Sequence, residues 1–212
     1  MVVRIDGDLV IPAQATGLVL FAHGSGSSRK SPRNRYVAGV LQQAGIGTLL
    51  FDLLTAKEEA VDARTGELRF DVHLLAERLV EATDWLQQQE RVLAMRIGYF
   101  GASTGAAAAL MAAARTPERI AAVVSRGGRP DLAAAELREV KAPTLLIVGG
   151  RDQEVITLNE RALAELICEK RLAIVPGATH LFEEPGTLEQ VAQLARDWFS
   201  SRLAPRASGT QR

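Results

Sequence analysis

Short apolar runs alternate with longer amphipathic stretches along most of this chain, and this alternation restricts the fold more than any other feature. Each run is bounded by glycine, proline or polar residues, which is typical of strands buried on both faces of a sheet. The runs lie at 17–22, 48–51, 95–100, 120–124, 144–148 and 172–175. The stretches between them predict helices at 32–44, 72–86, 104–115, 158–168 and 188–203. The alternation predicts an α/β fold, with a mostly parallel central sheet and helices on both of its faces.

The N-terminus departs from this pattern. Asp6-Gly7-Asp8 separates two short β-like runs at 2–5 and 9–11, and Asp-Gly favours a hairpin turn, so we expect an N-terminal antiparallel hairpin. The 212 residues fit a single domain over 1–203, followed by a frayed tail at 204–212. The 126–142 segment is too short to hold a cap domain.

The overall composition excludes several functional classes. Lys+Arg and Asp+Glu are 25 each, so the net charge of zero does not fit a nucleic-acid or basic membrane-surface binder. No apolar run approaches the roughly 18 residues of a membrane span, and the N-terminus lacks the features of a signal peptide. We therefore expect a cytoplasmic monomer or homodimer that binds neither nucleic acid nor membranes.

Cofactor and metal motifs are missing from the sequence as well. Gly24-x-Gly26 is followed by Arg29 where a dinucleotide fingerprint needs a small residue, and no lysine follows a glycine as in a phosphate-binding loop. The lone Cys168 and three scattered histidines do not have the spacing of metal ligands. We predict neither a cofactor nor a metal.

In a parallel α/β sheet, ligands bind at the carboxyl ends of the strands, and one such end carries a nucleophile motif. Gly101-x-Ser103-x-Gly105 matches the nucleophile elbow, with a strand before it and an alanine-rich helix after it. A sharp strand-to-helix turn projects the serine Oγ from the sheet and leaves room only for glycine beside it. Ser103 is the predicted nucleophile.

A serine hydroxyl needs an adjacent base, and the sequence offers three histidines. His180 follows the last predicted strand, on the same sheet edge as Ser103, and is the preferred base. His73 lies near the start of a predicted helix and fits a surface or packing role. His23 lies in the first glycine-rich loop and fits a role in shaping that turn.

The base in turn needs a carboxylate that orients it. Asp152 follows the penultimate predicted strand, and the order serine, aspartate, histidine is the one associated with a nucleophile elbow in this kind of fold. Glu154 and Asp131 lie near the same edge and remain alternatives.

Two loops could supply oxyanion donors and substrate contacts. The Thr104 N–H follows the nucleophile, and the loop after 17–22 offers the Ser25 N–H, with Gly24 as the alternative. Further candidates for substrate contact are His23, Gly24, Arg126 and Arg129. The arginines could hold a substrate carboxylate, or they could be solvated or pair with neighbouring acids.

Four motifs together resemble a known family. They are HGSGSS at 23–28, GASTG at 101–105, GGRD at 149–152 and GATHLF at 177–182. With them the chain resembles an α/β-hydrolase, and among these the compact dienelactone hydrolase-like family. SPRNRYVA at 31–38 and SRGGRPDL at 125–132 also resemble hydrolase halves that are fused to a phosphoribosyltransferase half, which this chain does not contain.

The resemblance implies Ser103 as nucleophile, Asp152 and His180 as its partners, and Ser25 and Thr104 as oxyanion donors. Dienelactone hydrolases carry cysteine at the elbow, so the serine here favours hydrolysis of small carboxylic esters through an acyl-enzyme. An acyltransferase or thioesterase using the same triad is one alternative. A non-catalytic binding module with a hydrolase-like fold is the other.

Overall fold

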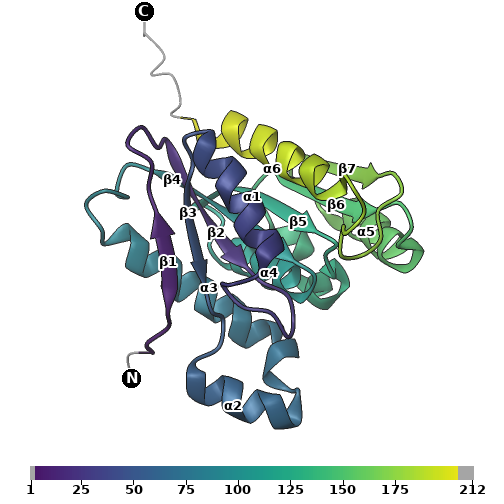
Figure 1. Ribbon diagram of the computed structural model, residues 1–212, viewed down its shortest axis with the longest axis horizontal. Helices are drawn as coiled ribbons and strands as arrows, with labels where there is room; N and C mark the ends of the chain where they lie inside the picture. The colour runs from purple at the N-terminus through teal and green to yellow at the C-terminus, as the bar shows by residue number, and fades with distance from the viewer. Residues whose placement is uncertain (1–2, 205–212) are drawn as a thin grey trace, which may run out of the picture.

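The computed structural model describes residues 3–204, which form a seven-stranded sheet with helices on both faces (Figure 1). The strands are β1 (Gly7–Val10), β2 (Gly17–Ala22), β3 (Gly47–Phe51), β4 (Arg96–Ala102), β5 (Ile120–Arg126), β6 (Thr144–Gly149) and β7 (Lys170–Val175). Their spatial order is β1-β3-β2-β4-β5-β6-β7, with every pair parallel except β1 and β3. The predicted mostly parallel sheet is therefore confirmed.

Two helical layers cover the sheet. Helices α1 (Pro32–Gln43) and α6 (Thr187–Leu203) lie on one face, toward the viewer in Figure 1. Helices α3 (Val72–Gln87), α4 (Thr104–Arg115) and α5 (Gln153–Glu165) lie on the other. Each layer buries its own apolar cluster against the sheet. The predicted helices on both faces are confirmed.

One helix was not expected from the sequence. Helix α2 (Ala56–Thr65) projects from the sheet at the bottom of Figure 1 and is followed by a short 3-10 helix, η1 (Leu68–Phe70). Thr55 and Glu58 form a reciprocal capping box at its start, and Gly66 ends it in a left-handed conformation with φ 69°. Its polar surface gives little apolar periodicity, but the capping box was a local signal that could have revealed it.

The expected N-terminal hairpin does not form within the described residues. Strand β1 begins at Gly7 itself and pairs antiparallel with β3, with Gly7 opposite Phe51. A tight hairpin at Asp-Gly needs positive φ, and Gly7 does not adopt it. Its missing side chain instead allows close pairing, because a Cβ there would lie 3.1 Å from the Leu49 side chain.

Two other expectations need correction. The helix expected from residue 158 begins at Gln153, directly after the strand-end turn. Strand β7 is not buried on both faces, since it is the last strand of the sheet and Ile174 is 42% exposed. The other helix and strand boundaries agree with prediction to within a few residues.

The chain between β5 and β6 contains only η2 (Pro130–Glu139), a kinked 3-10 segment, so the described residues include no cap domain there. No helix within residues 3–204 is long and apolar enough to cross a membrane. Apart from Ala204, the expected frayed tail lies outside the described residues.

Burial predicts which leucines hold the fold together. Leu79 on α3 is fully buried between helix and sheet, whereas Leu93 in the following loop is 67% exposed. We expect Leu79→Ala to lower the free energy of unfolding by about 2–5 kcal/mol, because it leaves a cavity. Leu93→Ala should change that energy by less than about 0.5 kcal/mol. Urea denaturation of both variants checks this, and equal losses would contradict the packing described.

Candidate active site

Ser103 occupies a strained turn between β4 and α4. It has φ 51° and ψ −119°, a conformation that non-glycine residues rarely adopt. The two neighbouring glycines are sterically required: a Cβ on Gly101 would lie 2.4 Å from the Ala106 Cα, and one on Gly105 would lie 2.3 Å from the Ala22 carbonyl oxygen. This is the geometry of a nucleophile elbow, which projects the serine beyond the sheet edge.

Asp152 and His180 form a direct pair at the same edge. The His180 Nδ1 lies 2.6 Å from the Asp152 Oδ2, and the carboxylate is largely buried while the imidazole is 38% exposed. A carboxylate only accepts, so Nδ1 carries the proton of this bond and Nε2 remains the basic nitrogen of the neutral ring. Each residue follows a strand end, Asp152 after β6 and His180 after β7.

Ser103 and His180 line one cavity of about 210 Å³. Its walls are formed by Gly24, Ser25, Ser27, Ser31, Arg33, Asn34, Ala102, Ser103, Arg126, His180 and Leu181. Within residues 3–204, neither the Ser103 Oγ nor the His180 Nε2 has a hydrogen-bond partner. Catalytic hydrogen bonds are often long before substrate binds, so this geometry is compatible with a resting enzyme.

The loop between β2 and α1 contacts the elbow through the predicted oxyanion residues. Ser25 donates its backbone N–H to the Thr104 Oγ1 at 2.9 Å. The Thr104 N–H, in the first turn of α4, has no acceptor within the described residues. Gly24 lies close to the elbow, since a Cβ there would be 3.3 Å from that of Ser103.

His23 uses both of its ring nitrogens within the protein. Its Nε2 accepts the Leu53 N–H at 3.1 Å, so the proton lies on Nδ1, which donates to the Gly24 carbonyl at 3.0 Å. Burial lowers the pKa of His23 and favours this neutral form. The histidine therefore fastens the glycine-rich loop to the end of β3.

Arg126, the last residue of β5, is an unpaired cation in the cavity wall. It is only 7% exposed, and its Nε is enclosed without a hydrogen-bond partner. No carboxylate within residues 3–204 pairs with it, and its only aromatic neighbour is Phe182, whose ring centroid lies 5.8 Å from the guanidinium carbon. Burial, together with the charge of Arg33, lowers the pKa of Arg126 to about 10.

Arg129 lies in a different environment from Arg126. Its Nε and Nη2 donate to the two carboxylate oxygens of Asp131 at 2.9 and 2.8 Å, and it does not line the cavity. This pair also occupies Asp131, one of the alternative partners for His180. The other, Glu154, makes no hydrogen bond to His180.

Several cavity residues were not predicted as site residues from the sequence, and three of them lie together in the chain. Ser31, Arg33 and Asn34 come from the start of α1, where the Ser31 hydroxyl accepts the Asn34 N–H. The Asn34 Oδ1 and the Arg33 Nε are buried without a partner in the described part of the chain, while the Arg33 Nη1 donates to Glu183 at 3.2 Å. A helix that follows a strand-end loop starts near the same edge, and this rule could have identified its first turn.

The remaining histidine and the cysteine lie away from the cavity. His73 on α3 is exposed and contacts Arg115 at 2.8 Å. Cys168 is half-buried against Thr144, and burial raises the pKa of its thiol. Within residues 3–204 no group of three or more histidine, cysteine, aspartate or glutamate side chains could hold a metal ion.

Known proteins resemble this chain over most of its length. Residues 19–202 match the model of the dienelactone hydrolase family. The chain belongs to this family. Membership of this family supports a hydrolase.

Individual relatives show how widely the similarity extends. A crystal structure of a dienelactone hydrolase from Anabaena variabilis is 65% identical, covers 95% of this chain and 93% of its own, and superposes with a TM-score of 0.93. Est1E from Butyrivibrio proteoclasticus has a TM-score of 0.80 over 95% of each chain at 15% identity, which shows a shared fold. A Mycobacterium tuberculosis protein named as a proposed phosphoribosyl transferase is 59% identical over 98% of this chain. The chain spans only 46% of that relative's length.

The close packing at the elbow can be tested by adding one methyl group. Gly105→Ala should lower the free energy of unfolding by at least about 2 kcal/mol, because its Cβ would meet backbone oxygens that cannot move aside. Gly39, inside α1, has nothing within 4 Å of its Cβ position. Gly39→Ala should therefore stabilise the protein by about 0.5–1 kcal/mol. Thermal denaturation would contradict the geometry if the two substitutions had the same effect.

The role of His23 can be tested through pH. Its pKa is lowered in the folded protein, whereas the unfolded chain takes up a proton below about pH 6.5. Acid therefore favours the unfolded wild type. The wild type should lose about 1 kcal/mol relative to His23→Gln between pH 7.5 and 5.5. Urea denaturation at both pH values measures this, and a difference independent of pH would show that burial does not perturb the ring.

Proposed function

We propose that this chain is a serine hydrolase that cleaves small carboxylic esters through an acyl-enzyme intermediate. The observation that carries the proposal is the 2.6 Å Asp152–His180 pair beside the cavity that Ser103 and His180 share. A relative that is 65% identical is named a dienelactone hydrolase, and a lactone is a cyclic ester. The cavity of about 210 Å³ favours a small substrate.

In the proposed mechanism, the His180 Nε2 removes the proton of Ser103 as Oγ attacks the ester carbonyl carbon. Asp152 holds the Nδ1 tautomer and stabilises the imidazolium that forms. When the tetrahedral intermediate collapses, the carbon–oxygen bond to the alcohol breaks and His180 protonates the leaving oxygen. His180 then activates a water that hydrolyses the acyl-enzyme and restores Ser103.

The proposed oxyanion donors are the backbone N–H groups of Thr104 and Ser25. The first has no acceptor within residues 3–204 and lies at the start of α4, where the helix dipole favours negative charge. The second is donated to the Thr104 hydroxyl in the resting protein. An oxyanion is a stronger acceptor than a neutral hydroxyl, so the developing charge would take this bond from Thr104.

The assignment of the carboxylate can be tested with two matched substitutions. Asp152→Asn should lower kcat for a chromogenic ester by up to about 10⁴-fold, because the amide favours the wrong imidazole tautomer. Glu154→Gln removes a carboxylate two positions away that makes no bond to His180, so kcat should stay within about twofold. The opposite pattern would move the orienting role to Glu154.

The nucleophile can be tested without knowing the substrate. Intact-protein mass after exposure to a fluorophosphonate should increase by one adduct, mapped to the peptide that contains Ser103, while Ser103→Ala stays unmodified. Absence of an adduct on the folded wild type would favour a non-catalytic binding module. Comparing oxygen ester and thioester turnover, with and without an added alcohol, separates an esterase from a thioesterase or an acyltransferase.

A further inference from the structure

The burial of Arg126 without a partner is not explained by the stability of the fold. An arginine that is 93% removed from solvent normally has a carboxylate partner, because burying an unpaired charge is costly. Within residues 3–204 one other arginine, Arg78, is nine-tenths buried, and it follows this rule by donating to Glu58 and Glu81 at 2.8 and 3.0 Å. Arg126 has no such partner within residues 3–204.

The residues around Arg126 add to the positive electrostatic potential of the cavity. Arg33 lines the same cavity, and its charge disfavours that of Arg126. No aspartate or glutamate is among the lining residues, and Glu183, the acid that pairs with Arg33 within residues 3–204, is 63% exposed. Two helix N-termini meet here as well, since Ser31 caps α1 and Ser103 precedes α4. The charges of these groups favour an anion in the cavity.

The donors around this space exceed what a carboxylate can use. Ser25, Ser27 and Ser31, each of which carries a hydroxyl, line the cavity together with Arg33 and Arg126. The Ser31 oxygen already accepts from Asn34, which leaves its hydrogen free to donate. A carboxylate presents two oxygens, whereas a phosphate monoester presents three terminal oxygens and up to two charges. The donor set therefore favours phosphate over carboxylate.

We propose that Arg126 and Arg33 bind a phosphate group carried by the substrate, so that the natural substrate is a small ester that also bears a phosphate monoester. This inference rests on the proposed function for the ester cleavage. The phosphate is held and is not transferred: the bond that breaks remains the one between the acyl carbon and the ester oxygen. Arg126 thereby determines which esters are positioned at Ser103.

Binding is tested on Ser103→Ala, which keeps the cavity but cannot turn over an ester. Calorimetric titration compares phenyl phosphate with benzoate, which carry the same ring with a phosphate or a carboxylate. We expect phenyl phosphate to bind at least about tenfold more tightly than benzoate. Equal affinity would overturn the assignment to phosphate, and no binding of either would overturn the site.

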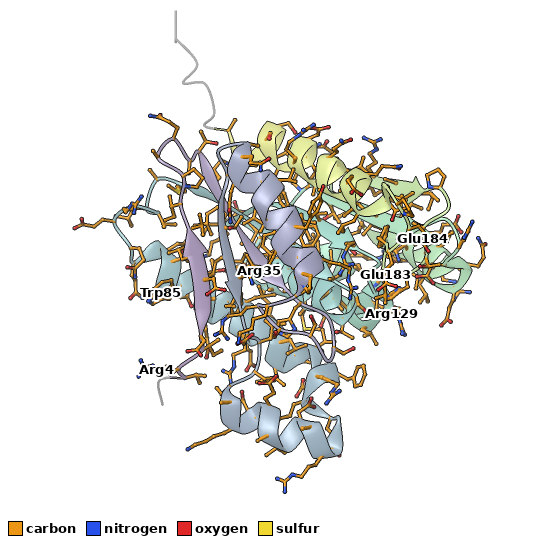
Figure 2. All side chains as sticks on the ribbon, in the orientation of Figure 1. Arg4, Arg35, Trp85, Arg129, Glu183 and Glu184 are labelled. Atoms are coloured by element: carbon orange, nitrogen blue, oxygen red, sulfur yellow. The ribbon has the colours of Figure 1, made fainter. Side chains whose placement is uncertain are left out.

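The arginine is tested by adding a second substitution to Ser103→Ala. Arg126→Met should weaken phenyl phosphate binding by about 10- to 100-fold, which corresponds to the loss of a charged hydrogen-bond pair. Arg35→Gln is the matched control, since Arg35 is an exposed residue of α1 outside the cavity (Figure 2). It removes the same charge and should change the affinity less than twofold. Equal losses in both variants would indicate only a general charge effect and overturn the proposal.

Stability provides an independent measurement. Because Arg126→Met removes an unpaired buried charge, its melting temperature without ligand should rise above that of the parent protein. Phenyl phosphate should raise the melting temperature of the parent and leave that of the variant unchanged. If Arg126→Met does not fold, Arg126→Lys keeps the charge without the planar fork and should still weaken phenyl phosphate binding.

The two proposals fail in distinguishable ways. If the fluorophosphonate labels Ser103 of the wild type but Ser103→Ala does not bind phenyl phosphate, the phosphate site is wrong and the hydrolase stands. If phenyl phosphate binds through Arg126 but Ser103 is not labelled and no ester is cleaved, the hydrolase is wrong and the anion site stands.

Discussion

Helix α4 approaches the sheet so closely in its first turn that backbone atoms form the contact. The Cβ position of Gly105 would lie 2.3 Å from the Ala22 carbonyl oxygen, and the four alanines at 106–109 are fully buried. A helix held at this distance leaves only a strained turn for the residue that joins it to β4. Ser103 occupies that turn, so its exposure at the sheet edge is a consequence of how α4 packs.

The other site residues depend on the same edge. Parallel strands place the carboxyl ends of β2, β5, β6 and β7 along one edge of the sheet. Arg126 ends β5, and the loops after the other three strands contribute Ser25, Asp152 and His180. The closeness of neighbouring loops again requires small residues, since a Cβ on Gly149 would lie 2.5 Å from the Ala178 carbonyl oxygen. The stability of the site is therefore mostly that of the sheet. Arg126 is the exception, because its burial opposes folding and gains nothing from any described acid.

Much of the fold was predictable because its strands are short, apolar and clearly bounded. Helix α4 has the predicted ends, and the rule that strand ends share an edge places Ser103 and His180 on one cavity. The prediction of an N-terminal hairpin was wrong, because Asp-Gly forms a tight turn only where the glycine takes positive φ, and Gly7 does not. The unpaired state of Arg126 could not be predicted, because it depends on where every acidic side chain of the folded chain lies.

The Ser25–Thr104 hydrogen bond affects how the proposed site distinguishes the bound ester from the tetrahedral intermediate. A donor that already has an acceptor gains little from an ester carbonyl, which is a neutral oxygen like the hydroxyl it would replace. It gains considerably more from the negative oxygen of the tetrahedral intermediate. In the proposed mechanism, this contact therefore contributes little to ground-state affinity and most of its free energy to lowering the barrier. The Thr104 hydroxyl would thus compete with the substrate oxygen for the Ser25 N–H. Only a substrate oxygen that has developed enough negative charge would displace it.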